Sequence, residues 1–290
     1  MKIQNILTVF IIMSILPMTV MAGGGWPQPK GKAYVKLSEW WTSSDQHYTD
    51  VGLIDPNVTL GIYTTSIYAE YGITNRLTGT IYFPFFSRAL INNTVSSTTG
   101  EVLNAGDAIN GLGDTDISLK YGITGSGSPI AISASVLFGI PLGNDLGGKD
   151  QNLQTGDGEF NQLIQLDAGS GFNLGSLSAY VNAHIAYNNR TSGFSDELRY
   201  GVEAGVATLD SKLWLIGRLN RVDSRKNGTL GNNSTGTSIF SNNAEFTSLG
   251  AEVSYKINDK LGFSAGITGA MNGRIILAAP SYTVGVFVNI

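Results

Sequence analysis

Apolar and polar residues alternate with a period of two along most of the chain. The pattern is clearest in the last ten residues, Ser281–Ile290. Their apolar set is Tyr282, Val284, Val286, Val288 and Ile290, and the alternate set, Thr283, Gly285, Phe287 and Asn289, is mixed. Successive side chains of a strand point to opposite faces, so one face is wholly apolar. An exposed edge strand with such a face would promote aggregation in water. In lipid it can close a barrel by pairing with the first strand.

The same alternation predicts about twelve strands. Pro84 removes a backbone donor inside the third strand, which predicts a bulge or a rim position there. The predicted strands are residues 33–42, 58–73, 77–87, 113–123, 130–142, 158–172, 177–188, 197–208, 212–222, 245–257, 260–271 and 281–290.

Long polar connections alternate with short turns between these strands. The long ones are residues 43–57, 88–112, 143–156, 189–196 and 223–244. This asymmetry is typical of outer-membrane barrels, whose short turns are periplasmic and whose long loops are external. A large soluble sandwich also offers short alternating strands. It does not readily give one apolar face in nearly every strand. We therefore predict an all-β, transmembrane, antiparallel up-and-down β-barrel over residues 33–290.

The start of the chain has the pattern of a secretory signal peptide. Lys2 precedes an apolar run, and Val20 and Ala22 occupy the positions that a signal peptidase reads. We expect cleavage near Ala22, a Gly/Pro-rich periplasmic arm over residues 23–32, and location in the bacterial outer membrane. The sequence contains no cysteine, which excludes disulfides and thiolate metal sites.

Composition narrows the possible partners. Only 14% of the residues are charged, yet no apolar run after the predicted signal peptide is long enough for a helical span. The net charge of −4 argues against nucleic acid as a partner. We expect outer-membrane lipids, the barrel-assembly machinery and a small-molecule solute as partners, and no cofactor.

The less apolar side of the strands should face the lumen, because its charged and polar side chains are unfavourable in hydrocarbon. They could form a permeation path, or they could fill a narrow lumen with their own ion pairs and hydrogen bonds. For any single residue the second interpretation is favoured. The candidates are Lys36, Glu70, Asp114, Asp116, Lys120, Asp167, His184, Arg199, Glu203, Arg218, Glu252 and Lys256.

Two further groups of residues bear on catalysis and metal binding. His47 and His184 are the only histidines, and no nucleophile motif accompanies them, so we predict that the protein is not an enzyme and has no catalytic residues. Asn144–Glu159 carries oxygen ligands of the kind that hard cations bind, but the spacing matches no ligand register. We therefore predict no metal site and interpret this segment as a solvated external loop.

Three short motifs resemble a known family. Gly111-Leu112-Gly113-Asp114 leads to Leu119-Lys120-Tyr121, the next strand closes on Pro141-Leu142-Gly143, and Gly156-Asp157-Gly158 opens the following one. Over roughly residues 111–172 this is similar to outer-membrane proteins of the MetA-pathway of phenol degradation family. The resemblance implies a transporter-like barrel for small solutes, aromatic or other hydrophobic compounds among them. The arm at residues 23–27 has no counterpart in that family.

Two functions from different classes remain. The first is an outer-membrane channel for small solutes with a narrow polar lumen, because about twelve strands lie between filled small barrels and open porins. The alternative is a non-conducting surface or structural barrel whose long loops, residues 88–112 and 223–244, bind an external partner.

Overall fold

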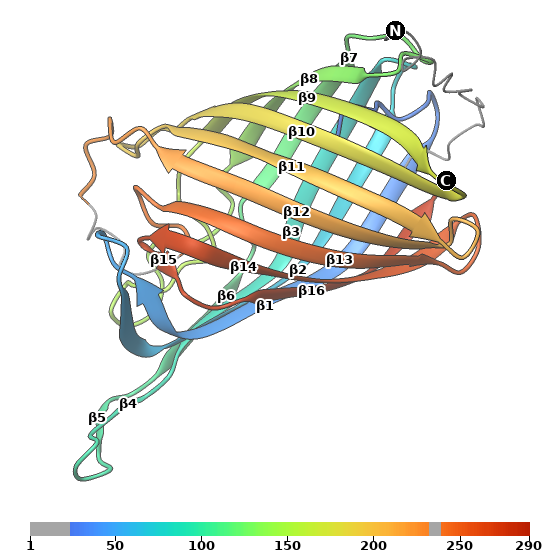
Figure 1. The fold of residues 1–290 in the computed structure, drawn as a ribbon. Coiled ribbons are helices and arrows are strands. Elements are labelled where there is room, and N and C mark those ends of the chain that lie inside the picture. The colour runs from blue at the N-terminus through green and yellow to red at the C-terminus, as the bar shows by residue number, and fades with distance from the viewer. Residues whose placement is uncertain (1–23, 232–238) are drawn as a thin grey trace, which may run out of the picture.

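The structure, a computed structural model, describes residues 24–231 and 239–290; the predicted signal peptide lies outside them. Twelve antiparallel strands form a closed barrel (Figure 1), which confirms the predicted fold class. The strands of the wall are β1 (Ala33–Tyr48), β2 (Ile54–Gly72), β3 (Leu77–Ile91), β7 (Thr115–Gly122), β8 (Ala131–Ile140), β9 (Asn161–Leu174), β10 (Leu177–Asn189), β11 (Glu197–Thr208), β12 (Leu213–Ser224), β13 (Glu245–Lys256), β14 (Leu261–Arg274) and β16 (Ser281–Asn289).

The barrel closes where β16 pairs with β1. Their register runs without a break from Tyr34 opposite Asn289 to Thr42 opposite Ser281. Beyond it, the amide nitrogens of Ala33 and Ile290 each donate to the other residue's carbonyl, at 3.0 and 2.8 Å. Every backbone group along this seam therefore has a partner, which a lipid-embedded strand requires.

The external ends of the first three strands are longer than predicted. β1 and β2 continue through most of the expected loop at residues 43–57, with a bulge between Ser44 and Gln46. Within the expected loop at 88–112, β3 continues to Ile91 and pairs with β6 (Asp107–Gly111). The alternation was lost because both faces of a strand meet water beyond the membrane, so neither face needs to be apolar.

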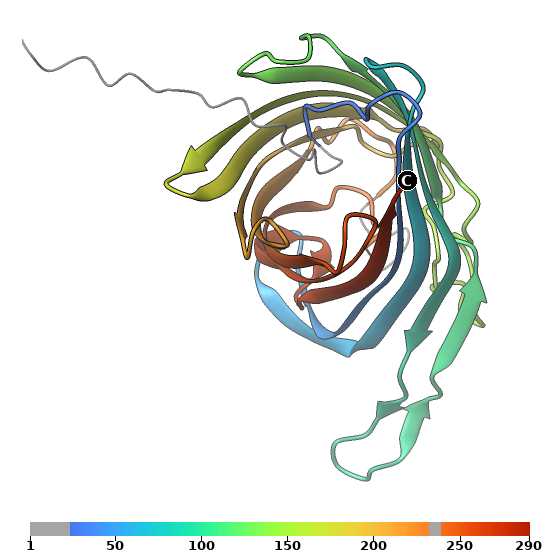
Figure 2. The ribbon, with the colours of Figure 1, turned by 90° about the vertical axis from the view of Figure 1, so that its right-hand side faces the viewer.

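A small hairpin and a short bridge complete the external end. β4 (Thr94–Val95) pairs with β5 (Val102–Asn104), and together they project away from the wall (Figure 2). β15 (Ile276–Leu277) pairs with the end of β1.

Pro84 lies in the predicted bulge. Thr65 and Ile67 of β2 pair with Phe86 and Phe83 of β3, so one β2 residue stands opposite two on β3. At this bulge β3 changes partner from β7 to β6, and the carbonyl of Pro84 accepts a 2.8 Å hydrogen bond from the Gly113 amide. The missing donor of the proline thus falls at a break in the ladder.

The two faces of the wall differ as the alternation predicts. On β8, Val136 is exposed whereas Ser135 is buried, and on β16 Phe287 is buried next to exposed Val286. Tyr71, Tyr187, Tyr200 and Tyr255 are exposed on the outer side, at positions suited to interface girdles.

The arm before β1 folds back into the barrel at the end that carries the short turns, which is the periplasmic end in outer-membrane barrels (Figure 2). The Gly25 amide donates to Asn182 Oδ1 of β10 at 3.0 Å. The Gln28 amide donates to Thr78 Oγ1 of β3 at 2.8 Å. These two strands are separated by β7, β8 and β9 in the sheet, so the arm crosses part of the lumen.

Candidate functional site

The candidate site is the lumen between the arm and the external loops. All twelve predicted lumen residues lie on the less exposed side of the sheet, and each is buried or half-buried. The structure joins several of them in one chain of ion pairs and places the others singly. Their role in permeation stays a prediction.

Four of these residues form a continuous chain of charges. Lys36 Nζ lies 3.7 Å from Glu252 Oε1, whose other oxygen is 2.8 Å from Arg218 Nη1. Arg218 Nε then lies 2.5 Å from Glu203 Oε2. Tyr180 extends the chain, since its hydroxyl donates to Glu203 Oε1 at 2.6 Å. Two cations and two anions balance here, so the chain gives the lumen no strong preference for either sign.

Glu70 connects the wall to the arm. Its carboxylate is fully buried and accepts hydrogen bonds from Gln28 Nε2, at 3.1 Å, and from the Tyr68 hydroxyl. Burial of an ionised carboxylate is unfavourable unless hydrogen bonds compensate it. Glu70 thus favours the arm in its folded-in position.

The remaining lumen candidates lie apart from that chain. His184 stands opposite Asp167 in the ladder of β9 and β10, and Asp167 accepts from Gln165 Nε2 at 2.9 and 3.0 Å. Lys120 is buried between Thr78 and Ser135. Asp116 stands opposite Gly139, Arg199 binds Glu197 at 2.5 Å, and Lys256 lies at the end of β13.

Aromatic side chains gather around the arm. Trp26 meets Tyr180 edge-on with ring centroids 6.1 Å apart, and Tyr180 packs on Trp214 at 5.5 Å. Trp214 is buried with Ala207 and Ile216, and its Nε1 has no hydrogen-bond partner among the described residues. Sequence reasoning missed Trp26, because the arm has no strand periodicity.

Asp114 does not point into an open path. Its two carboxylate oxygens accept from the amides of Gly143, at 2.9 Å, and Asp157, at 2.7 Å. These contacts fasten the segment between β8 and β9 to the start of β7. A Cβ at Gly156 would overlap this carboxylate, so the contact requires glycine there.

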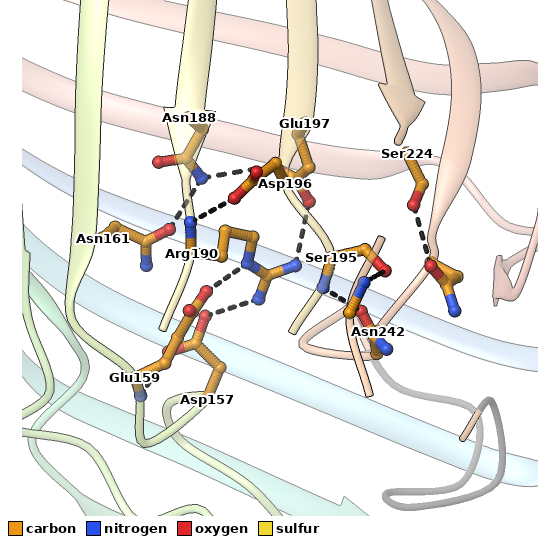
Figure 3. Close-up of polar contacts among 12 residues, drawn as sticks. Asp157, Glu159, Asn161, Asn188, Arg190, Ser195, Asp196, Glu197, Ser224 and Asn242 are labelled. Carbon is orange, nitrogen blue, oxygen red and sulfur yellow. Dashed lines mark hydrogen bonds and ion pairs between the residues drawn. The ribbon is translucent and has the colours of Figure 1, made fainter. Parts of the chain in front are cut away.

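The prediction of a solvated loop at Asn144–Glu159 holds for residues 144–146 and 149–152, which are exposed, and is wrong for most of the second half of the segment. Leu153, Gln154, Thr155 and Glu159 are all buried. The reason is Arg190, just after β10, which pairs with Asp157, Glu159 and Glu197 (Figure 3). A charged loop can leave water when its charges find partners, and those partners lie on a distant part of the sequence.

Arg190 is the residue that sequence reasoning missed. Its side chain is only 5% exposed, and its guanidinium also lies 4.3 Å over the Phe194 ring. The Thr191 amide adds a 2.8 Å hydrogen bond to Glu159 Oε2. The one available signal was a cation beside a strand end facing a loop rich in acids. Across the two described ranges, no group of three His, Cys, Asp or Glu residues is placed to hold a metal ion.

Comparisons with known proteins support the fold. The chain is 15% identical to the COG4313 outer membrane channel from Pseudomonas putida F1, over 93% of this chain and 100% of that one, with a TM-score of 0.61. The beta domain of the Bordetella autotransporter BrkA is 13% identical over 91% and 100% of the two chains, and its TM-score is 0.49. The NanC porin is 10% identical over 87% and 98%, with a TM-score of 0.47.

No family model matches the chain, and no curated protein matches it. The likeness to the Pseudomonas channel therefore establishes a shared fold. This protein shares the fold of that channel, a closed antiparallel twelve-stranded barrel, which confirms the resemblance described above at the level of the fold.

Proposed function

We propose that the protein is an outer-membrane channel that passes small solutes through a narrow lumen. The observation that carries this proposal is water-accessible surface inside a closed wall. The side chains of Arg218 and Glu203 point inward and are nevertheless 33% and 27% exposed. In a barrel filled by its own side chains these groups would be fully covered. The lumen therefore holds space for water or a solute.

The solute class follows from what lines that space. Charged groups are paired in the Lys36–Glu203 chain, whereas the half-buried rings of Trp26 and Tyr180 present aromatic surface at the periplasmic side, with buried Trp214 packed behind Tyr180. Paired charges attract neither cations nor anions strongly, and aromatic rings bind apolar and aromatic molecules. We propose small aromatic or hydrophobic compounds as solutes, in agreement with the family resemblance.

Liposome swelling tests the channel directly. Proteoliposomes are mixed with a panel of small sugars, amino acids and aromatic compounds, and the swelling rate is compared with that of empty liposomes. We expect faster entry of small aromatic compounds and slow or no entry of sugars. In planar bilayers we expect small conductance steps or none. Swelling at the empty-liposome rate for every solute, or porin-sized steps, would contradict the proposal.

One observation favours the alternative of a surface barrel that binds a partner. The β4–β5 hairpin carries exposed Val95, Val102 and Leu103 and stands away from the wall. Deleting residues 93–105 separates the two functions. Loss of adhesion with unchanged solute uptake supports the alternative, whereas intact adhesion leaves the channel as the function.

A further inference from the structure

We propose that the segment between β8 and β9, residues 141–160, is a movable loop at the external mouth, and that Arg190 is the latch that holds it closed. The inference rests on the proposed function, since a latch regulates access to the lumen.

The latch joins three separate elements. Asp157 and Glu159 come from the loop, Arg190 follows β10, and Glu197 begins β11 (Figure 3). Arg190 Nη2 lies 3.1 Å from Asp157 Oδ2, Nη1 lies 2.9 Å from Glu197 Oε1, and Nε pairs with Glu159. A planar guanidinium with donors on three sides can bind three carboxylates at once, which an ammonium group cannot do as well.

Hydrogen bonds to two further carboxylates also hold the loop. On the far side it is held by Asp114, which accepts two backbone amides, and by Asp107, whose carboxylate accepts the Lys149 amide at 2.6 Å. Between these anchors, Gln154 is buried, but its Oε1 and Nε2 have no partners among the described residues. A buried unpartnered amide is unfavourable. The closed loop therefore combines a buried amide that has no protein partner with the three ion pairs of Arg190, and segments that open locally have few favourable contacts of their own.

Gln154 also supplies the probe. The natural chain has no cysteine, so Gln154→Cys creates a unique thiol, and it removes no hydrogen bond that the structure contains. The thiol is buried while the loop is closed, so its reaction with a membrane-impermeant maleimide reports opening. A second protein, Ser97→Cys on the exposed β4–β5 connection, corrects for the reactivity of the reagent.

The experiment compares labelling rates in outer membranes of Gln154→Cys alone and combined with Arg190→Ala. We expect Arg190→Ala to raise the rate by about tenfold or more, because it leaves buried carboxylates without a counter-ion. The matched control is Arg221→Ala. Arg221 is also an external-end arginine bound to a carboxylate, 2.5 Å from Asp223 Oδ1, but it faces outward beside exposed Tyr200. This control should label at the parent rate.

Arg190→Lys keeps the charge and loses the fork, so we expect an intermediate labelling rate. If Arg190→Ala does not show the heat-modifiable mobility of a folded barrel, the labelling rate of Arg190→Lys tests the latch instead. Parent rates in the folded arginine variants would overturn the latch. Labelling requires no solute flux. Faster labelling in a barrel that passes no solute would therefore refute the channel and support the latch. Solute passage with unchanged labelling rates would support the channel and refute the latch.

Discussion

Lys36 Nζ lies 3.7 Å from Glu252 Oε1 although two strands, β16 and β14, stand between β1 and β13. Neighbouring strands are about 4.8 Å apart, so the two side chains span roughly 14 Å of wall. Glycine makes the contact possible. A Cβ at Gly285 would lie 2.8 Å from Lys36 Cε, so a larger residue there would displace the lysine side chain. The lumen is narrow enough there for opposite charges to meet across it.

Neutralising Glu252 should change ion preference. Glu252→Gln leaves Lys36 and Arg218 with one carboxylate, Glu203, between them. We therefore expect the reversal potential in a salt gradient to shift toward anions, measured in planar bilayers. Glu101→Gln, on the exposed hairpin, is the charge-matched control and should not shift it. An unchanged potential in Glu252→Gln would place the chain of charges outside the ion path.

The position of the arm depends on an absent side chain on β9. A Cβ at Gly169 would lie 2.5 Å from Trp26 Cη2, so Gly169→Val should displace the arm. We expect a several-fold faster swelling of proteoliposomes in small solutes, because the crossing segment leaves the lumen. Gly217→Val adds the same side chain on the outer face of β12, where nothing lies within 4 Å, and should be silent. Equal swelling in the two variants would show that the arm does not limit passage.

The facing of β8 gives a paired prediction. Val136 is exposed to the lipid side and Ser135 is buried on the lumen side. Val136→Arg should destabilise the folded barrel by about 2–4 kcal/mol if it lies near the midplane. Ser135→Arg should assemble and alter conduction. Urea unfolding in lipid vesicles measures the difference in stability between the two variants. Equal stabilities would contradict the facing assigned to β8.

The external loop should respond to pH with a definite sign. Burial raises the pKa of Glu159 to about 7, against the opposing effect of Arg190. An ordinary glutamate has a pKa of 4.5, so closing the loop takes up a proton at pH values between 4.5 and about 7. The closed state is favoured below about 4.5 and loses this stabilisation as the pH rises through 7. Labelling of Gln154→Cys should therefore accelerate with rising pH, by at most about tenfold per unit.

Glu159→Gln is the test of that assignment, because it keeps hydrogen-bonding capacity and cannot ionise. We expect slow labelling at every pH from about 6 to about 8, one unit either side of the pKa of Glu159. The other charged groups around Glu159 are Asp157, Glu197, Arg190 and Arg199. Asp114, which accepts the Gly143 and Asp157 amides, also titrates in this range, because burial raises its pKa to about 6. If the pH response survives Glu159→Gln, Asp114 or one of these groups must carry it.

The closing strand should be indispensable. Removing Val286–Ile290 deletes the partners of Tyr34–Leu37 on β1 and of Leu261 and Phe263 on β14. Each orphaned backbone group in hydrocarbon costs several kcal/mol, so we expect no heat-modifiable, membrane-inserted protein and a degraded or aggregated periplasmic chain. Removing residues 23–26 should still give an inserted barrel. Normal insertion of the C-terminal deletion would contradict the closed twelve-strand wall.

The wall could be predicted from sequence because lipid imposes the same rule on every strand. Alternation at Ser281–Ile290 or around Val136 records that rule in local sequence. The arm and the loop follow no such rule. Trp26 is held by Gly169 and Tyr180, and Arg190 by Glu159, over separations that only the closed barrel brings together. Periodicity therefore separates the two faces of the wall and leaves the contacts inside the barrel unknown.

The path of the arm also sets an order for assembly. Residues 24–29 precede β1, yet their partners include Asn182 on β10 and Thr78 on β3. The first described part of the chain therefore cannot take its final position until strands far behind it have joined the sheet. An unfinished barrel would keep an unobstructed interior, and filling of the periplasmic mouth would be among the last folding events. An assembly intermediate arrested before β10 should accordingly leave the Trp26 ring in water.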